Sequence, residues 1–316
     1  MNRLPAILLC AALGLLPACD RGGAPPPAPP SDAARESALS EAHRGVGPAP
    51  PEVRDGADMV PVPGGPFVFG SDREDPENRS LEYGGRRVWY ADEHPQATPA
   101  LAPFRIDRTE VTEGAYKRFV DAIGYPPPPH WAGKEGMPER PDYPIVNVNW
   151  MDAQNYCHWR GARLPTEREW EKAARGTGGA EYPWGDAFDR DRANVGQVGD
   201  LTPAGHFAES ASPYGAVDMA GNVWEWVADW YAAYPGNPLQ SPLFGKRYKV
   251  VRGGSSGGQG GHYQLEALTN RAAYRFFLDP RMQVPDVGFR CAQGLDANGR
   301  PVDDHARRLH GATDTP

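Results

Sequence analysis

The stretch DMAGNVWEW, Asp218–Trp226, places two carboxylates around a glycine and contains two tryptophans. Gly221 permits a tight turn that directs backbone carbonyl groups inward, and Asp218 and Glu225 add side-chain oxygens. Oxygen ligands of this kind are the ones that Ca2+ takes. The alternative is that both acids cap turns and pair with arginine. The two tryptophans, together with Trp230, indicate an aromatic core rather than a platform for stacking sugars.

The composition around this stretch predicts one folded domain with attached segments. The chain has 316 residues, 40% of them hydrophobic, and a net charge of −8. Without a basic stripe to neutralise phosphates, general nucleic-acid binding is excluded. Its 37 glycines and 35 prolines interrupt regular elements, so we expect a loop-rich domain with few long helices.

The first residues, MNRLPAILLCAALGLLPACD, predict an export signal, because one cation at Arg3 precedes an apolar run. Residues 16–19, LPAC, resemble the bacterial lipobox, in which Cys19 is lipidated and becomes the mature first residue. An ordinary cleaved signal is the alternative. We therefore expect residues 1–19 to be a lipoprotein signal peptide and the protein to face the periplasm from a membrane of the cell envelope, inner or outer.

Two further segments flank the predicted domain. Residues 20–54 include APPPAPP and almost no large apolar side chains, so they predict a Pro/Ala-rich disordered tether. Residues 294–316 are polar and lack a hydrophobic period, which predicts a frayed tail. The domain itself is expected over residues 55–293.

Local patterns within the domain predict a hairpin and three helices. ADMVPVPGGPFVFGS, residues 57–71, predicts two strands around a Pro-Gly turn. Helical spacing predicts one helix from Thr112 to Ile123 and a second from Asn149 to Gly161. In LPTEREWEKAARG, residues 164–176, Thr166 and Glu169 predict a capping box. Residues 72–100 are charged and predict a surface insertion.

Several motifs, in this order, resemble those of the sulfatase-modifying factor family. They are PGGPF at 63–67, TEVT at 109–112, RLPTE at 163–167, YPWG at 182–185, DMAGNVWEW at 218–226, RGGS at 252–255 and GFRC at 288–291. The family includes formylglycine-generating enzyme, a pyoverdine-maturing periplasmic oxidoreductase, a domain of ergothioneine-pathway sulfoxide synthases, and gliding-motility lipoproteins. The resemblance implies a loop-rich α+β fold related to C-type lectins.

The resemblance to formylglycine-generating enzyme also implies two structural calcium sites. The first would be formed by two carboxylates and two backbone carbonyls, those of Asp218, Glu225, Gly221 and Val223. The second would be formed by two side chains and two carbonyls, those of Asn194, Asp200, Val195 and Thr202. The alternative for both sets is turn capping and pairing with arginine.

Four cysteines occur in the chain, and two of them, Cys10 and Cys19, fall in the export segment. Cys157 and Cys291 lie in motifs that are disulfide-bonded to each other in formylglycine-generating enzyme, so the resemblance implies a Cys157–Cys291 bridge. An oxidising compartment would permit it. Two buried free thiols are the alternative.

The glycine-rich stretch VVRGGSSGGQGGHYQ, residues 250–264, stands where formylglycine-generating enzyme carries its copper-binding cysteine pair. Aligned from the RGGS motif, those two positions fall on Gly258 and Tyr263. Neither residue supplies the thiolate that Cu(I) selects, and no cysteine occurs between Cys157 and Cys291. Copper and formylglycine generation are therefore not expected. A phosphate cradle is also not expected, because no Lys-Ser or Lys-Thr follows.

Around this stretch, a set of polar side chains is expected to line a cleft near Trp224: Ser255, His262, Asn270, Arg271 and Arg275. The candidate catalytic residues are His262, Ser255 and Arg271. His262 suits proton transfer or metal ligation, with an ordinary surface histidine as the alternative. Arg252 and Arg290 belong to motifs shared by functionally different members, so we expect them to brace the fold.

These observations lead to a main hypothesis of a lipid-anchored binding or scaffold protein without copper-thiol chemistry. Its partners would be the membrane and an envelope protein, small molecule or glycan. The rival hypothesis is a divergent oxidoreductase resembling the pyoverdine-maturing enzyme, acting on a small molecule or peptide. A lectin-like glycan binder, based on fold analogy alone, is a third hypothesis.

Overall fold

The computed structural model describes residues 58–77, 79–82, 88–133, 138–257 and 263–302. The expected signal peptide and tether, including Cys19, lie outside these residues, as do Gly258 and His262. None of the helices in the described part of the chain has the length and apolarity needed to cross a membrane.

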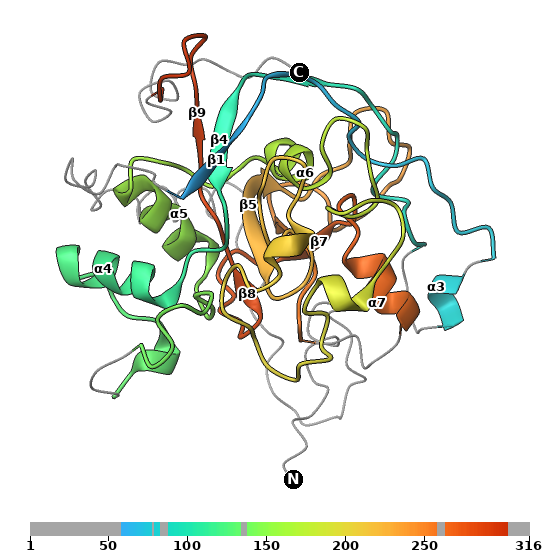
Figure 1. Cartoon of the computed structure of the whole chain (residues 1–316). Coiled ribbons are helices and arrows are strands. Elements are labelled where there is room, and N and C mark those ends of the chain that lie inside the picture. Colours follow the sequence, from blue (N-terminus) through green and yellow to red (C-terminus); the bar gives the residue numbers. More distant parts are fainter. Residues whose placement is uncertain (1–57, 78, 83–87, 134–137, 258–262, 303–316) are drawn as a thin grey trace.

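Short strands, short helices and long connections alternate along the chain (Figure 1). The strands are β1 (Met59–Val62), β2 (Gly65–Pro66), β3 (Ala100–Leu101), β4 (Phe104–Asp107), β5 (Trp224–Trp230), β6 (Lys249–Arg252), β7 (Phe276–Leu278), β8 (Val287–Gly288) and β9 (Ala292–Gly294). The α-helices are α3 (Arg79–Glu82), α4 (Glu113–Ile123), α5 (Trp150–Trp159), α6 (Glu167–Arg175) and α7 (Tyr263–Thr269). In the described ranges, 3-10 turns lie in the connections at η3 (Pro129–Trp131), η4 (Arg190–Arg192) and η5 (Ala208–Ser210). The predicted α+β class with many loops is confirmed.

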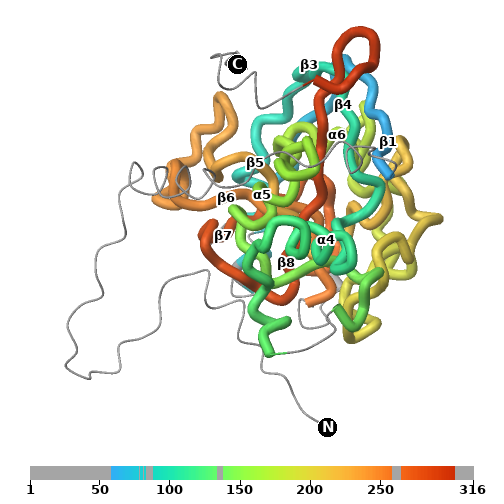
Figure 2. The backbone as a smooth tube through the Cα atoms, turned by 90° about the vertical axis from the view of Figure 1, so that its left-hand side faces the viewer, coloured from blue at the N-terminus to red at the C-terminus, as the bar shows by residue number. Residues whose placement is uncertain are grey.

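The predicted N-terminal hairpin is wrong, because its first strand pairs elsewhere. β1 is antiparallel to β4, with Val60 opposite Ile106, and β4 is antiparallel to β9. In Figure 2 the red segment near the C-terminal end of the described chain, which contains β9, runs beside β4. The turn after β1 is held instead by the ammonium group of Lys172, which donates to the carbonyls of Pro63 and Gly65 at 2.7 and 3.0 Å. These bonds direct the chain across α6 rather than back along β1.

The three predicted helices are confirmed by their caps. Thr112 accepts from the amide of Ala115 at the start of α4, and Gly124 ends this helix with φ +66°. Asn149 caps α5. Thr166 and Glu169 form the predicted capping box of α6, which satisfies amide groups that the first turn leaves free.

A four-stranded sheet in the order β7-β6-β5-β8 lies at the centre. β5 is antiparallel to β6, with Glu225 opposite Arg252, and parallel to β8, with Glu225 opposite Gly288. The sheet therefore brings three motifs together that are far apart in the sequence: DMAGNVWEW, RGGS and GFRC.

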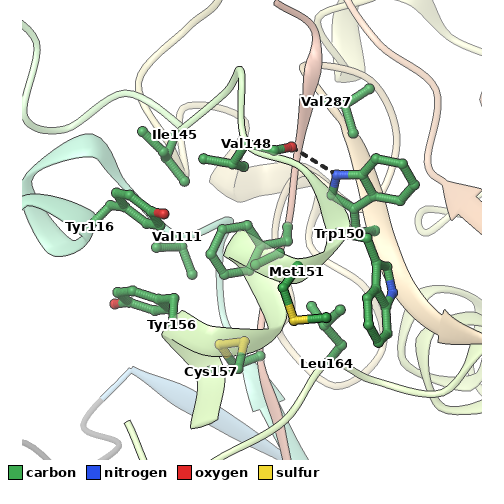
Figure 3. Close-up of a cluster of buried hydrophobic side chains, with 14 of the residues drawn as sticks. Val111, Tyr116, Ile145, Val148, Trp150, Met151, Tyr156, Cys157, Leu164 and Val287 are labelled. Atoms are coloured by element: carbon green, nitrogen blue, oxygen red, sulfur yellow. Dashed lines mark hydrogen bonds between the residues drawn. A yellow bond between two sulfur atoms is a disulfide. The ribbon is translucent and has the colours of Figure 1, made fainter. Parts of the chain in front are cut away.

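The largest aromatic core lies between this sheet and α4 and α5, which occupy one side of the molecule (Figure 1). Trp226 donates its indole N–H to the carbonyl of Val148 at 3.1 Å, so its polar atom is satisfied inside the core. Figure 3 shows Tyr116, Tyr156 and Cys157 within this cluster. Cys157 is bonded to Cys291 with a Cα–Cα distance of 5.6 Å, which confirms the predicted disulfide and links α5 to the chain entering β9.

The segment predicted as a surface insertion is only partly exposed. Asp92 is 0% exposed and Glu93 1% exposed: the carboxylate of Asp92 accepts from the hydroxyl of Tyr231 at 2.6 Å, and that of Glu93 pairs with Arg271 at 2.9 Å. The amide of Glu93 donates to the carbonyl of Tyr90, and Arg275 donates to the carbonyl of Asp92. The charged residues of this stretch therefore include a buried partner of an arginine as well as side chains exposed to solvent.

Candidate functional site

The candidate site begins where β6 ends and the chain turns through two glycines. Gly253 and Gly254 have φ angles of +97° and +78°, which glycine adopts without strain. A Cβ on Gly254 would lie 2.2 Å from the side-chain oxygen of Asn270, so a larger residue would have to displace this buried side chain. The turn carries Ser255 inward, where its side chain is 4% exposed.

Ser255 donates its hydroxyl to Oδ2 of Asp286 at 2.9 Å. Burial raises the pKa of Asp286, and the hydrogen bond from Ser255 offsets part of this increase. The backbone approaches the pair closely, because a Cβ on Gly257 would stand 2.6 Å from the same carboxylate oxygen. The pair thus consists of a hydroxyl and a half-buried acid whose charged form is disfavoured by burial.

Aromatic side chains pack beside this pair. The amide of Trp224 donates to the carbonyl of Asp286 at 2.9 Å, which fixes the start of β5 against the chain entering β8. The ring of Trp224 stacks on Phe276 at 5.3 Å between centroids, and Tyr274 lies 6.0 Å away. As expected, Trp224 lies near Ser255, but it is only 6% exposed and belongs mainly to the core.

The arginines expected to line the cleft form buried ion pairs. Arg271 is 2% exposed and donates to both oxygens of Glu93 at 2.9 Å and to Glu181 at 2.5 Å. Arg275 is 1% exposed and donates to both oxygens of Glu167, at 2.8 and 2.9 Å. The structure therefore gives these two residues, including the catalytic candidate Arg271, a structural position.

Of the remaining residues predicted to line the cleft, the structure describes Asn270 but not His262. Asn270 is 1% exposed and donates to the carbonyl of Glu266 at 2.8 Å, while its oxygen faces Gly254. The backbone of Tyr263 begins α7. His262 lies outside the described residues, so its role as a candidate stays a prediction.

The carboxylates of the first predicted calcium site are already engaged. Glu225 accepts from Arg290 at 2.6 and 2.7 Å and from the indole of Trp170 at 2.7 Å. Asp218 accepts from the amide of Gly205 at 2.6 Å. Because Arg290 neutralises Glu225, the four-ligand set implied by the family resemblance does not fit a divalent ion without displacing this arginine.

The second predicted set is also internally bonded. The amide nitrogen of Asn194 donates to the carbonyl of Asp200 at 2.8 Å. The carboxylate of Asp200 faces Arg140, also at 2.8 Å, and its side chain is 63% exposed. Thr202 donates its amide and hydroxyl to Asn222 at 3.0 and 3.2 Å. The side chains of this set are thus joined to protein partners, and the carbonyl of Thr202 also accepts from the side-chain amide of Asn222 at 3.3 Å.

One acid that the sequence analysis did not select changes the electrostatics near Asp218. Glu110 is 2% exposed, and its Oε1 accepts from Asn222 at 2.8 Å. Its Oε2 is buried without a hydrogen-bond partner in the described structure. Burial, with the charge of Asp218 as a further cause, raises the pKa of Glu110 well above its usual range. An orphaned oxygen beside a second buried acid fits a bound cation at Asp218 and Glu110.

Glu110 and Asp286 are the two site residues that the analysis of the sequence missed. Both lie in or near recognised features: Glu110 is within the TEVT motif, and Asp286 directly precedes β8 and stands two positions before Gly288, where the GFRC motif begins. Their position in or beside these motifs was the feature of the sequence from which both residues could have been selected as site candidates. Which side chains they face depends on long-range pairing that the sequence pattern does not contain.

The fold and these motifs define a sulfatase-modifying factor type of domain. The chain belongs to the sulfatase-modifying factor enzyme 1-like domain family, whose sequence profile matches residues 46–295.

Two curated relatives and one solved structure illustrate the similarity. The chain is 32% identical over 305 residues to the inactive C-alpha-formylglycine-generating enzyme 2 of Mus musculus, covering 78% of this chain and 88% of that protein. It is 33% identical over 308 residues to the formylglycine-generating enzyme of Thermomonospora curvata, covering 77% and 95%. The structure of PvdO from Pseudomonas aeruginosa matches with a TM-score of 0.56 and 28% identity, covering 75% of this chain and 94% of that one.

Proposed function

We propose that this chain is an exported, lipid-anchored binding protein that uses the formylglycine-generating-enzyme-like fold without copper-thiol oxidation. The observation that supports this proposal most is the state of the domain's cysteines. Cys157 and Cys291 are joined to each other, and no other cysteine occurs after Cys19. Copper-thiol oxidation needs a thiolate ligand, and the domain has none to supply.

The chemical part of the proposal is tested on the full exported chain. It would be incubated in air with copper and a cysteine peptide that the Thermomonospora curvata enzyme converts, and the peptide would be examined by mass spectrometry for an aldehyde. We expect no aldehyde, with full conversion by the control enzyme. Aldehyde formation would overturn the proposal.

The binding part concerns the floor formed by Ser255 and Asp286. Gly257→Leu would place its side chain against Asp286 and obstruct this floor, whereas Gly178→Leu has open space around its Cβ and serves as the matched control. We expect an envelope ligand that is retained by the wild-type chain and Gly178→Leu to be lost by Gly257→Leu. Equal retention by all three chains would show that the floor is not the binding surface.

The anchoring proposal is supported by the lipobox-like LPAC at residues 16–19. Labelled palmitate should enter the wild-type chain and should be absent from Cys19→Ala. Incorporation into Cys19→Ala would show that the anchor is elsewhere.

Calcium, bound beside Asp218 and Glu110, is the ion that we propose stabilises this loop-rich domain, because both groups present hard oxygen donors.

A second candidate function is oxidation of a small molecule or peptide, as in the family's pyoverdine-maturing oxidoreductase. The raised pKa of Asp286 and its contact with Ser255 favour this candidate, since a half-buried acid is a suitable proton acceptor or donor at a reaction centre. Oxygen uptake with envelope extracts should then be abolished by Asp286→Asn. Uptake equal in both chains would exclude this role for Asp286.

A further inference from the structure

A histidine and a glutamate face each other where turn η3 meets the start of helix α4. Nε2 of His130 lies 3.5 Å from Oε1 of Glu113, and the two side chains are 26% and 8% exposed. This separation is too long for a good hydrogen bond. In the described structure both ring nitrogens of His130 are buried and neither has a hydrogen-bond partner. Buried nitrogens of this kind are rare in folded proteins, so the pair needs a physical explanation.

Packing of the aromatic core holds the two side chains opposite each other. Glu113 is the first residue of α4, and Tyr116 lies one turn further along the same face. The ring of Tyr116, which Figure 3 shows in the core, packs edge-on against Trp131 at 6.2 Å between centroids. His130 directly precedes Trp131 in η3, after four prolines at 126–129 whose φ angles are fixed. The fold therefore brings the imidazole to the carboxylate.

Backbone groups at the start of α4 are already engaged within the protein. The amide of Glu113 donates to the carbonyl of Tyr143 at 2.8 Å, and the amide of Gly114 donates to the carbonyl of Pro141 at 2.9 Å. These two amides are therefore not available to an anion. The carboxylate of Glu113 and a neutral imidazole at His130 each supply a lone pair. Two lone-pair donors that face each other can share a cation.

We propose that His130 and Glu113 bind a zinc ion whose coordination is completed by water. Zn2+ takes imidazole nitrogen and carboxylate oxygen as ligands, at about 2.0 to 2.2 Å. Two such bonds at a tetrahedral angle separate the nitrogen from the oxygen by about 3.4 Å, which matches the observed 3.5 Å. Ca2+ takes oxygen ligands, so the chemistry of this pair differs from that of the calcium site proposed at Asp218 and Glu110. The zinc site goes beyond the proposed function, because it shares no residue with the binding floor or the calcium site.

The experiment is calorimetric titration of the full chain with zinc chloride, with calcium in excess so that the proposed calcium site is filled. We expect the wild-type chain to bind zinc. His130→Phe keeps a ring against Trp131 but removes the nitrogen, and Glu113→Gln keeps the length of the side chain but removes its charge. Each variant should weaken zinc binding by more than about tenfold, because one of two protein ligands is lost. Urea titration without zinc checks that each variant folds, and either variant alone is sufficient for the test.

His206→Phe and Glu209→Gln are the matched controls, since both residues are exposed. Zinc should bind these two variants as it binds the wild-type chain, and it should raise their melting temperatures but not those of the site variants. Failure of the wild-type chain to bind zinc would overturn the proposal and show that the contact is an ordinary ion pair. Equal affinities in all five chains would overturn it as well, because the zinc would then bind elsewhere. Neither result depends on Ser255 or Asp286, so this test is independent of the proposed binding floor.

Discussion

The end of β6 joins two regions in which charge is buried in different ways. Arg252, the last residue of the strand, is 0% exposed and faces Glu171, while Arg175 binds the same carboxylate at 2.9 Å. Three residues later, Ser255 is the hydrogen-bond donor to the side chain of Asp286. In the first region opposite charges meet, and in the second an acid meets a neutral hydroxyl.

This difference separates groups that support the fold from groups available for function. Coulombic attraction to Glu171 raises the pKa of Arg252 against the effect of its burial, so its charged form is retained. Burial raises the pKa of Asp286 because no cation compensates the loss of water. A buried acid without a counter-charge is a candidate for binding or proton transfer, whereas a matched pair holds elements together.

The largest expected effect is on the first region, in which Arg252 and Arg175 are matched with the carboxylate of Glu171. Arg252→Met would remove the cation from a fully buried carboxylate and leave two backbone carbonyls, those of Ala273 and Tyr274, without their donor. We expect the free energy of unfolding to fall by about 3 to 4 kcal/mol, measured by urea titration, because Glu171 would keep the charge of Arg175 and the amide of Gly70 but lose the charge of Arg252.

Arg281→Met is the control for this variant. Arg281 also pairs with an acid, Asp279 at 2.7 Å, but its side chain is 65% exposed. Its loss should lower the free energy of unfolding by less than about 1 kcal/mol. Equal losses in the two variants would contradict the structural role assigned to the buried pair.

Much of this matched region was predictable from local sequence, and the reason is physical. The capping box of α6, formed by Thr166 and Glu169, depends on residues three apart, so its pattern is visible in the sequence. The bracing role of Arg252 and Arg290 followed from their place in family motifs, as did the Cys157–Cys291 disulfide.

The functional region was less predictable, because it depends on distant pairing. The contact of Ser255 with Asp286 joins residues 31 positions apart, and that of Glu110 with Asn222 joins residues 112 apart. Polarity alone placed Arg271 and Arg275 in the cleft. Their actual partners, Glu93 and Glu167, lie in segments whose position only the tertiary fold determines.

Glu110 and Asp218 bury charge in a third way, because two acids are neighbours and burial raises the pKa of both. Removal of calcium tests whether a bound cation balances their charge. If Ca2+ binds there, calcium at 100 times its dissociation constant should stabilise the fold by about 3 kcal/mol over the chelated protein. Thermal unfolding with calcium and with EDTA measures this difference.

Glu110→Gln should remove most of the calcium response, because it deletes the charge of the orphaned carboxylate. Glu209→Gln, at an exposed acid, is the control and should leave the response unchanged. A melting temperature unaffected by calcium in the wild-type chain would contradict the proposed ion.

A pH titration tests a further acid, Asp229 on β5, which is only partly buried. Burial, with a contribution from Glu167, raises its pKa to about 6. The folded state then binds a proton that the unfolded state releases near pH 4, so stability from this group is present below pH 4 and lost as pH rises through 6. Asp229→Asn keeps an acceptor for the amide of Glu167, which lies 2.6 Å from Oδ2.

We therefore expect Asp229→Asn to exceed the wild-type chain in stability by about 2 kcal/mol at pH 7.5, with a smaller difference at pH 4. Urea titrations across this range measure the difference. A gap of constant size would show that the substitution acts through packing and not through the proton.

The smallest expected effect is at the Ser255 and Asp286 pair. Asp286→Asn retains an oxygen that accepts from Ser255, and it removes a charge that burial disfavours. Its effect on the free energy of unfolding should therefore stay within about 1 kcal/mol and favour the variant as pH rises. Ser255→Ala removes the donor and should act in the opposite direction, because the carboxylate loses its hydrogen bond. If Asp286→Asn were as destabilising as Arg252→Met, the two regions at the end of β6 would be parts of one structural core, and the distinction between bracing charge and functional acid would fail.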